Sequence, residues 1–208
     1  MTPLANVLAR SSMVLSAIAL VTAPLPAQDA NINIRADSVE TLFRTRDFQI
    51  LDFMDTRFEG DRTQRVLLRF DDDTKAFAKW AMVPPGGVGV FNNRPRYECA
   101  AYELQKLFLD ELEYVVPPTV ARSISVEAYR AMVPRAEATF RNTESVLIVL
   151  QYWLWNVTAD GVWDKDRFEA DTLYARHFAN LNLFTHLIRH GDANKGNVLI
   201  SSIDSNPR

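Results

Sequence analysis

Cysteine is almost absent from this chain of 208 residues, where Cys99 is the only one. An intramolecular disulfide is therefore impossible in any compartment, and stability must come from packing. The sequence also has no HExxH motif and no clustered cysteines, so nothing in it supports a zinc site. The formal net charge is −3 and no block of basic residues occurs, which argues against nucleic acid as a partner.

Charge is also scarce at the N-terminus, where Arg10 is the only charged side chain before Asp29. Residues 11–20 form an apolar run, and prolines and small residues follow it. This pattern predicts a signal peptide over residues 1–27 and export to the periplasm or the medium. The run is too short to span a bilayer, although a retained anchor is the alternative. We expect no membrane association after cleavage.

The remaining sequence has enough apolar residues for a core, since 48% of the chain is hydrophobic. Residues 37–40 have capping-box spacing and predict a short helix that ends near Arg46. Three strand candidates follow at 48–58, 64–70 and 75–82, separated by short turns. These strands predict an antiparallel meander.

Lys79 lies in the middle of the third predicted strand. Strand alternation places it on one face with Phe77 and Ala81, and places the intervening residues on the other face. A lysine inside an apolar strand is costly unless an anionic group meets it. The alternative is an edge-strand lysine that protects against aggregation.

A helix is predicted over residues 95–112, because apolar residues repeat at helical spacing. Its predicted buried face consists of Tyr97, Ala101, Leu104 and Phe108. Glu98 and Glu103 flank this face on opposite sides, so periodicity alone does not decide which one points at Lys79. A solvated carboxylate is the alternative for either.

Further along, residues 145–155 form a dense apolar and aromatic run that is typical of a buried strand. Residues 166–169 repeat the capping-box spacing and predict the start of the longest helix. Its predicted core stripe is Tyr174, Phe178, Leu181, Phe184 and Leu187. We expect His177 and His186 to make local polar contacts.

The C-terminal stretch 190–200 (HGDANKGNVLI) places a carboxylate, Asp192, five residues before a carboxamide, Asn197. Phosphoryl transfer from ATP uses this pairing: an Asp beside the attacking hydroxyl, and an Asn oxygen that helps to hold the metal. The alternative is a polar helix-to-strand turn in which Gly191 and Gly196 supply positive φ angles.

This stretch resembles the catalytic loop of the protein-kinase-like superfamily. The HGD opening is most similar to aminoglycoside and choline kinases, and the GD-x4-N spacing also resembles phosphatidylinositol kinases. Residues 98–104 (ECAAYEL) and 115–120 (VVPPTV) resemble a run of the secretory-pathway casein kinases. The resemblance covers roughly residues 45–203.

The resemblance implies an α+β, two-lobed kinase-like fold, in which a small antiparallel sheet plus one helix precedes an incomplete, mainly helical C-terminal lobe. Residues 28–46 are then a linker and short helix, 47–150 the nucleotide-binding lobe and 151–208 the partial catalytic lobe. Residues 151–154 are a hinge that hydrogen-bonds adenine through its backbone.

The resemblance also implies site residues. Lys79, paired with Glu98, holds the phosphates of ATP, and Lys195 neutralises a phosphate. Asp192 is catalytic, and Asn197 binds Mg²⁺ or Mn²⁺.

Three departures from the family pattern stand out. The expected nucleotide loop, residues 57–62, contains a single glycine, Gly60. The glycines of 84–89 come after the predicted strand that carries Lys79, so they favour a flexible connection between that strand and the next helix. Phe77 replaces the usual small residue near adenine. No residue fits the second metal-binding Asp, because Asp204 lies too early, so we expect a truncated product, a fragment or a short pseudokinase.

Two functions are therefore expected. The first is an exported ATP-dependent phosphotransferase that acts on a hydroxyl of a protein or small molecule. The second is a non-catalytic pseudokinase or binding module.

Overall fold

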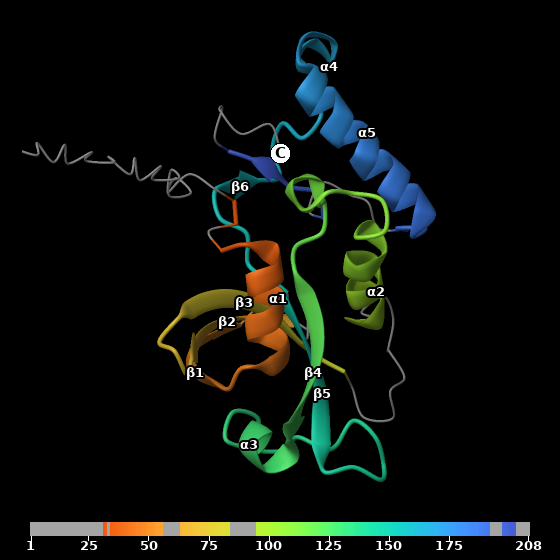
Figure 1. Ribbon diagram of the computed structural model, residues 1–208. Helices are drawn as coiled ribbons and strands as arrows, with labels where there is room; N and C mark the ends of the chain where they lie inside the picture. The colour runs from red at the N-terminus through yellow and green to blue at the C-terminus, as the bar shows by residue number, and fades with distance from the viewer. Residues whose placement is uncertain (1–30, 33, 56–62, 84–94, 192–196, 203–208) are drawn as a thin grey trace, which may run out of the picture.

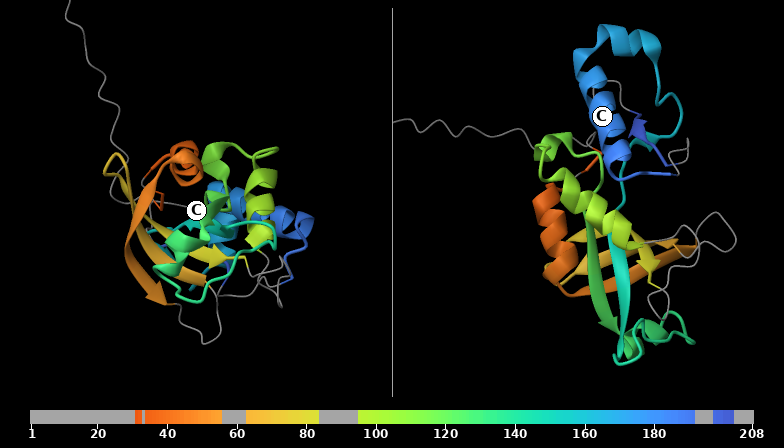
Figure 2. Two further views of the ribbon diagram at one scale, coloured as in Figure 1. Left: turned by 90° about the horizontal axis from the view of Figure 1, so that it is seen from below. Right: turned by 90° about the vertical axis from the view of Figure 1, so that its right-hand side faces the viewer.

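The computed structural model describes residues 31–32, 34–55, 63–83, 95–191 and 197–202. A five-stranded antiparallel sheet forms its centre, with the strands in the order β1 (Phe48–Asp55), β2 (Thr63–Phe70), β3 (Lys75–Met82), β5 (Ser145–Tyr152) and β4 (Thr119–Ser125). Helices α4 (Lys165–Ala170) and α5 (Thr172–Leu187) lie at one end of this sheet, and α3 (Val126–Arg130) lies at the opposite end (Figures 1 and 2). The mixture of helices with an antiparallel sheet confirms the α+β class.

The predicted meander is present as β1 (Phe48–Asp55), β2 (Thr63–Phe70) and β3 (Lys75–Met82). Strands β4 (Thr119–Ser125) and β5 (Ser145–Tyr152) complete the sheet. Because β3 pairs with β2 on one side and with β5 on the other, Lys79 belongs to an interior strand. The edge-strand alternative for this lysine is therefore wrong.

One face of the sheet carries the core. Ala78 and Trp80 of β3 are buried in it, as strand alternation predicts, and Lys79 points to the other face. Helix α1 (Ala36–Thr45) covers this core with Val39 and Phe43, both fully buried. The short helix assigned to the linker region thus belongs to the sheet's core, together with α3 (Val126–Arg130).

The capping box predicted at residues 37–40 is wrong. Helix α1 begins at Ala36 after Arg35, which makes no side-chain capping bond. The carboxylate of Glu40 contacts residues of the next helix instead. The Glu40 carboxylate therefore makes a tertiary contact with α2 instead of the capping bond that the local pattern predicts.

Helix α2 (Pro95–Gln105) is shorter than predicted, and a 3₁₀ helix (Glu111–Glu113) follows it. The predicted buried face is partly wrong, because the side chains of Tyr97 and Phe108 are exposed. The buried residues are Ala101, Tyr102, Gln105 and Leu109. Apolar periodicity missed this face because two of its members carry polar groups.

Gln105 is fully buried because hydrogen bonds satisfy its amide. Its Oε1 accepts from the main-chain N–H groups of Val115 and Val116, each at 2.9 Å. Its Nε2 donates to the carbonyl of Val116 at 2.7 Å. The end of α2 is therefore fastened to the segment that leads into β4.

After β5 the chain forms β6 (Val157–Thr158), α4 (Lys165–Ala170), α5 (Thr172–Leu187) and β7 (Ile200–Ser201). The longest helix begins at Thr172 rather than at 166, since Asp171 accepts from the amides of Leu173 and Tyr174 and caps a separate helix. Tyr174 and Phe184 are buried as predicted, whereas Leu187 is exposed.

No helix in the described ranges is long and apolar enough to cross a membrane. The predicted signal peptide, the loop 57–62 and the glycines of 84–89 lie outside the described residues, as does the end of the chain from 203.

Candidate functional site

A row of polar side chains crosses the face of the sheet that lies opposite the core. The row consists of four residues, each the register partner of the next: Arg65 on β2, Lys79 on β3, Gln151 on β5 and Thr119 on β4. Directly opposed residues of antiparallel strands share a face, so these side chains are neighbours. Gln151 Nε2 donates to Thr119 Oγ1 at 3.0 Å, which fixes one end of the row.

Lys79 reaches from this row to helix α2. Its Nζ lies 3.1 Å from both carboxylate oxygens of Glu98. The side chains are 32% and 25% exposed, so the ion pair is accessible but not fully solvated. The contact expected between these two residues is present. Glu103, the other candidate, pairs with Arg44 and Lys106 on the side of α2 that faces α1.

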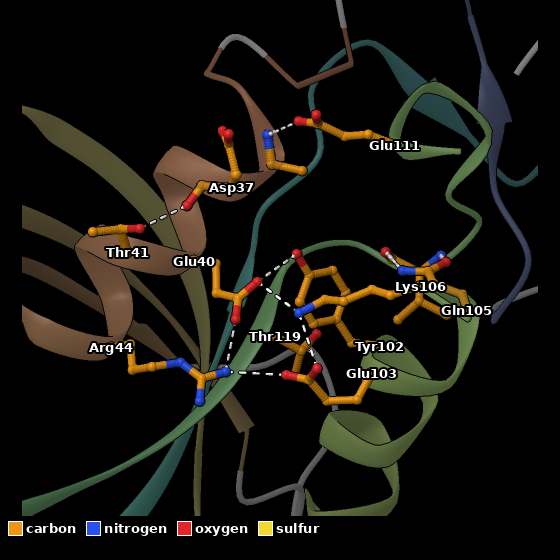
Figure 3. Close-up of polar contacts among 12 residues, drawn as sticks. Asp37, Glu40, Thr41, Arg44, Tyr102, Glu103, Gln105, Lys106, Glu111 and Thr119 are labelled. Carbon is orange, nitrogen blue, oxygen red and sulfur yellow. Dashed lines mark hydrogen bonds and ion pairs between the residues drawn. The ribbon is translucent and has the colours of Figure 1, made fainter. Parts of the chain in front are cut away.

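A second ionic cluster fixes α2 against α1 (Figure 3). Glu40 accepts from Lys106 Nζ at 2.7 Å, from Tyr102 Oη at 3.1 Å and from Arg44 Nη2 at 2.8 Å. Arg44 and Lys106 also each donate to Glu103 at 3.0 Å. We call these five residues the α1–α2 network.

The pKa values of the network reflect these contacts. Burial by itself would raise the pKa of Glu40, but the bond and charge of Lys106, together with Tyr102 and Arg44, lower it overall. Burial would lower the pKa of Lys106, and its bonds to Glu40 and Glu103 raise it overall. Both groups are held in their charged forms, so the network holds α2, and with it Glu98, in place.

The segment expected to serve as a hinge has most of its amides occupied. Tyr152 N donates to the carbonyl of Pro118 at 2.8 Å, and Trp153 N donates to that of Phe77 at 3.1 Å. Within the described part of the chain, no hydrogen bond involves the main chain of Leu154. Of these three amides, that of Leu154 is the one without a hydrogen-bond partner among the described residues.

Aromatic rings surround an arginine next to this segment. The guanidinium carbon of Arg65 lies 5.3 Å from the ring centres of both Phe77 and Trp153. Phe77 also meets Trp155 edge-on, with 5.3 Å between ring centres. Sequence reasoning noted Phe77 but missed Arg65. Its position opposite Lys79 on the neighbouring strand is the signal that could have found it.

The predicted catalytic stretch is described only in part. Asp192 and Lys195 lie outside the described residues, whereas Asn197 is described and exposed. Helix α5 leads directly to His190, whose N–H donates to the carbonyl of Thr185 at 2.9 Å. The positive φ of this turn belongs to Arg189 and not to Gly191, so the alternative role given to Gly191 is wrong.

Strand β7 brings the end of this stretch beside the segment that follows β5. It pairs with β6, and Ser202 N donates to the carbonyl of Asn156 at 2.8 Å. Among the described residues, no hydrogen bond or ion pair joins Asn197 to Lys79 or Glu98. The structure therefore joins Lys79 with Glu98, whereas Asn197 lies just before β7 in the chain.

A small apolar pocket of about 80 Å³ lies elsewhere, between α5 and the segment before β4. Tyr114, Phe178, Leu181 and Leu199 are among its lining residues, and no residue of the polar row takes part. No group of three or more His, Cys, Asp or Glu residues that could hold a metal occurs in the described ranges.

Comparisons with protein-family models, curated proteins and solved structures find no match for this chain.

Proposed function

We propose that this chain is an exported, kinase-like phosphotransferase that transfers the γ-phosphoryl group of ATP to a hydroxyl of a protein or small molecule. The pairing of Lys79 with Glu98 carries the proposal. It joins an interior strand to a helix on the face of the sheet that the core leaves open. A lysine held by one carboxylate keeps donor capacity for the phosphates of a nucleotide.

The proposed chemistry assigns a role to each predicted residue. Lys79 binds the phosphates, and Glu98 orients its ammonium group. Asp192 accepts the proton of the attacking hydroxyl as the new O–P bond forms, and the bond from the γ-phosphorus to the bridging oxygen breaks to release ADP. Lys195 neutralises phosphate charge.

Asn197 fits a metal-binding role by its chemistry, because the residue is exposed and a carboxamide oxygen is a type of ligand suited to Mg²⁺ or Mn²⁺. When bound, such an ion would neutralise charge on the phosphates.

A non-catalytic pseudokinase or binding module is the second candidate. The observation that favours it lies at the hinge segment, where the amides of Tyr152 and Trp153 already have main-chain partners. Phe77 adds bulk next to them. An adenine ring would find fewer hydrogen bonds there than in an ordinary kinase.

Thermal unfolding with millimolar ATP and Mn²⁺ separates the candidates, because ligand binding stabilises the folded state by mass action. An enzyme gives a shift in Tm and also transfers phosphate to itself or to a casein acceptor. A shift without transfer indicates a pseudokinase. The absence of any shift would leave only a module that does not bind nucleotide.

Asp192→Asn tests the chemical step. The variant should lose transfer by about three orders of magnitude or more and keep the nucleotide-dependent shift in Tm. Asp160→Asn is the matched control, since it makes the same change at an exposed residue after β6. Transfer by Asp192→Asn at the parent rate would rule out the assigned role.

A further inference from the structure

The open face of the sheet has two chemically different ends. From adjacent strand positions, the Lys79 side chain reaches α2, whereas the Arg65 side chain reaches Phe77 and Trp153. Trp153 follows directly on β5, and its amide bonds to the carbonyl of Phe77. If Lys79 marks the phosphate end of a nucleotide, Arg65 marks the end near the hinge segment, where the base would lie.

Arg65 has donors that the described protein does not satisfy. Its Nε is buried without a hydrogen-bond partner, and its Nη2 contacts the thioether sulfur of Met54, a weak acceptor. A buried donor without a partner is costly, and such groups call for an explanation. A ligand does not reach the buried Nε, but an acceptor-rich, planar ligand would bind the terminal Nη groups and stack on the neighbouring rings.

We infer that Arg65, Phe77 and Trp153 form the nucleobase end of the site and select guanine over adenine, which makes GTP the preferred phosphoryl donor. This inference rests on the proposed function. Guanine presents two adjacent acceptors, O6 and N7, to a guanidinium fork, whereas adenine presents one acceptor and an amino donor at the same edge. Phe77 and Trp153 supply stacking that either purine can use.

The test is a comparison of GTP and ATP affinity in the presence of Mn²⁺, measured by calorimetric titration of the full chain. The parent should bind GTP about tenfold more tightly than ATP. Arg65→Met should reduce this ratio to near one, because GTP loses a two-acceptor contact that adenine cannot form. Arg65→Lys keeps the charge but not the fork, and it should also lose the preference.

Arg69→Met is the matched control. Arg69 lies on the same strand and the same face, four residues from Arg65, and its guanidinium donates to Gln49. This variant should keep the parental preference for GTP. Unfolding of each variant without ligand establishes that the compared proteins are folded.

Three outcomes would overturn the inference. Equal binding of GTP and ATP by the parent, with both affinities dependent on Lys79, refutes the base preference but leaves the proposed function intact. An equal loss of both affinities in folded Arg65→Met means that Arg65 does not read the base. Binding of neither nucleotide by the parent removes the inference and the proposed function together.

Discussion

Helix α2 takes part in two lysine–glutamate pairs that are similarly exposed but differ in how many further partners the lysine has. The side chains of Lys79 and Glu98 are 32% and 25% exposed, and those of Lys106 and Glu40 are 24% and 21% exposed. Lys106 also bonds to Glu103 and lies 4.3 Å from the ring centre of Tyr102. In the part of the chain that is described, the Lys79 ammonium forms hydrogen bonds only with the carboxylate of Glu98.

This difference separates charged groups that only stabilise the fold from a charged group that can still bind a ligand. In the α1–α2 network every charge has at least two partners, so it holds helices together and offers little to a ligand. In the isolated pair the ammonium keeps unused donor capacity. Similar residues at similar burial can therefore be expected to respond differently to substitution.

The largest expected effect comes from Lys79→Met. Loss of a phosphate-binding donor should lower kcat/KM for transfer by about a hundredfold or more. The free energy of unfolding should change by less than about 1 kcal/mol, because the pair is partly solvated and isolated. Steady-state kinetics and urea unfolding measure the two effects.

Lys106→Met is the matched variant and should show the opposite pattern. Its free energy of unfolding should fall clearly, while kcat/KM for transfer by the folded protein should change little. If both lysine variants lost stability equally and kept transfer, the distinction between the two pairs would be wrong.

Gln105→Leu tests how strongly α2 is fastened at its other end. The substitution leaves the partly buried amides of Val115 and Val116 without acceptors, and we expect a loss of about 3 kcal/mol in the free energy of unfolding. Gln49→Leu, at an exposed position on β1, should change stability by less than about 0.5 kcal/mol. Equal effects in urea unfolding would show that the Gln105 bonds contribute little.

Glu40→Gln removes the central carboxylate of the α1–α2 network and should cost about 1–2 kcal/mol at neutral pH. Because the pKa of Glu40 is lowered in the folded state, its contribution is present above its unfolded pKa. The contribution disappears as pH falls through the folded pKa, so parent and variant stabilities should converge in acid. A gap that stays constant across the acid range in pH-dependent unfolding would contradict this assignment.

The smallest effect is expected at an ion pair outside both clusters. Lys165 and Glu169 are one turn apart on α4, with side chains 74% and 65% exposed. Glu169→Gln should change the free energy of unfolding by less than about 0.5 kcal/mol. A decrease in Tm as large as that of Glu40→Gln would mean that a carboxylate in the α1–α2 network stabilises the fold no more than one in an isolated exposed pair.

The sequence by itself determined the features that depend on local period and turn chemistry. The strands of the meander and the alternation of Lys79 with Ala78 and Trp80 follow from a period of two, which neighbouring residues specify among themselves. The existence of α5 and its approach to His190 follow from helical spacing in the same way. The choice of Glu98 over Glu103 needed the family resemblance as well, because both carboxylates flank the apolar stripe.

Only the tertiary structure decided which polar groups are buried and what they bind. Gln105 faces inward because main-chain groups ten and eleven residues away satisfy it, and Glu40 faces α2 because Lys106 and Tyr102 lie more than sixty residues away in the chain. Arg65 could be recognised as a site residue only from the strand register, which places it opposite Lys79, and from its contacts with two aromatic rings. Burial of a polar group depends on a partner, and a distant partner leaves no trace in the local pattern.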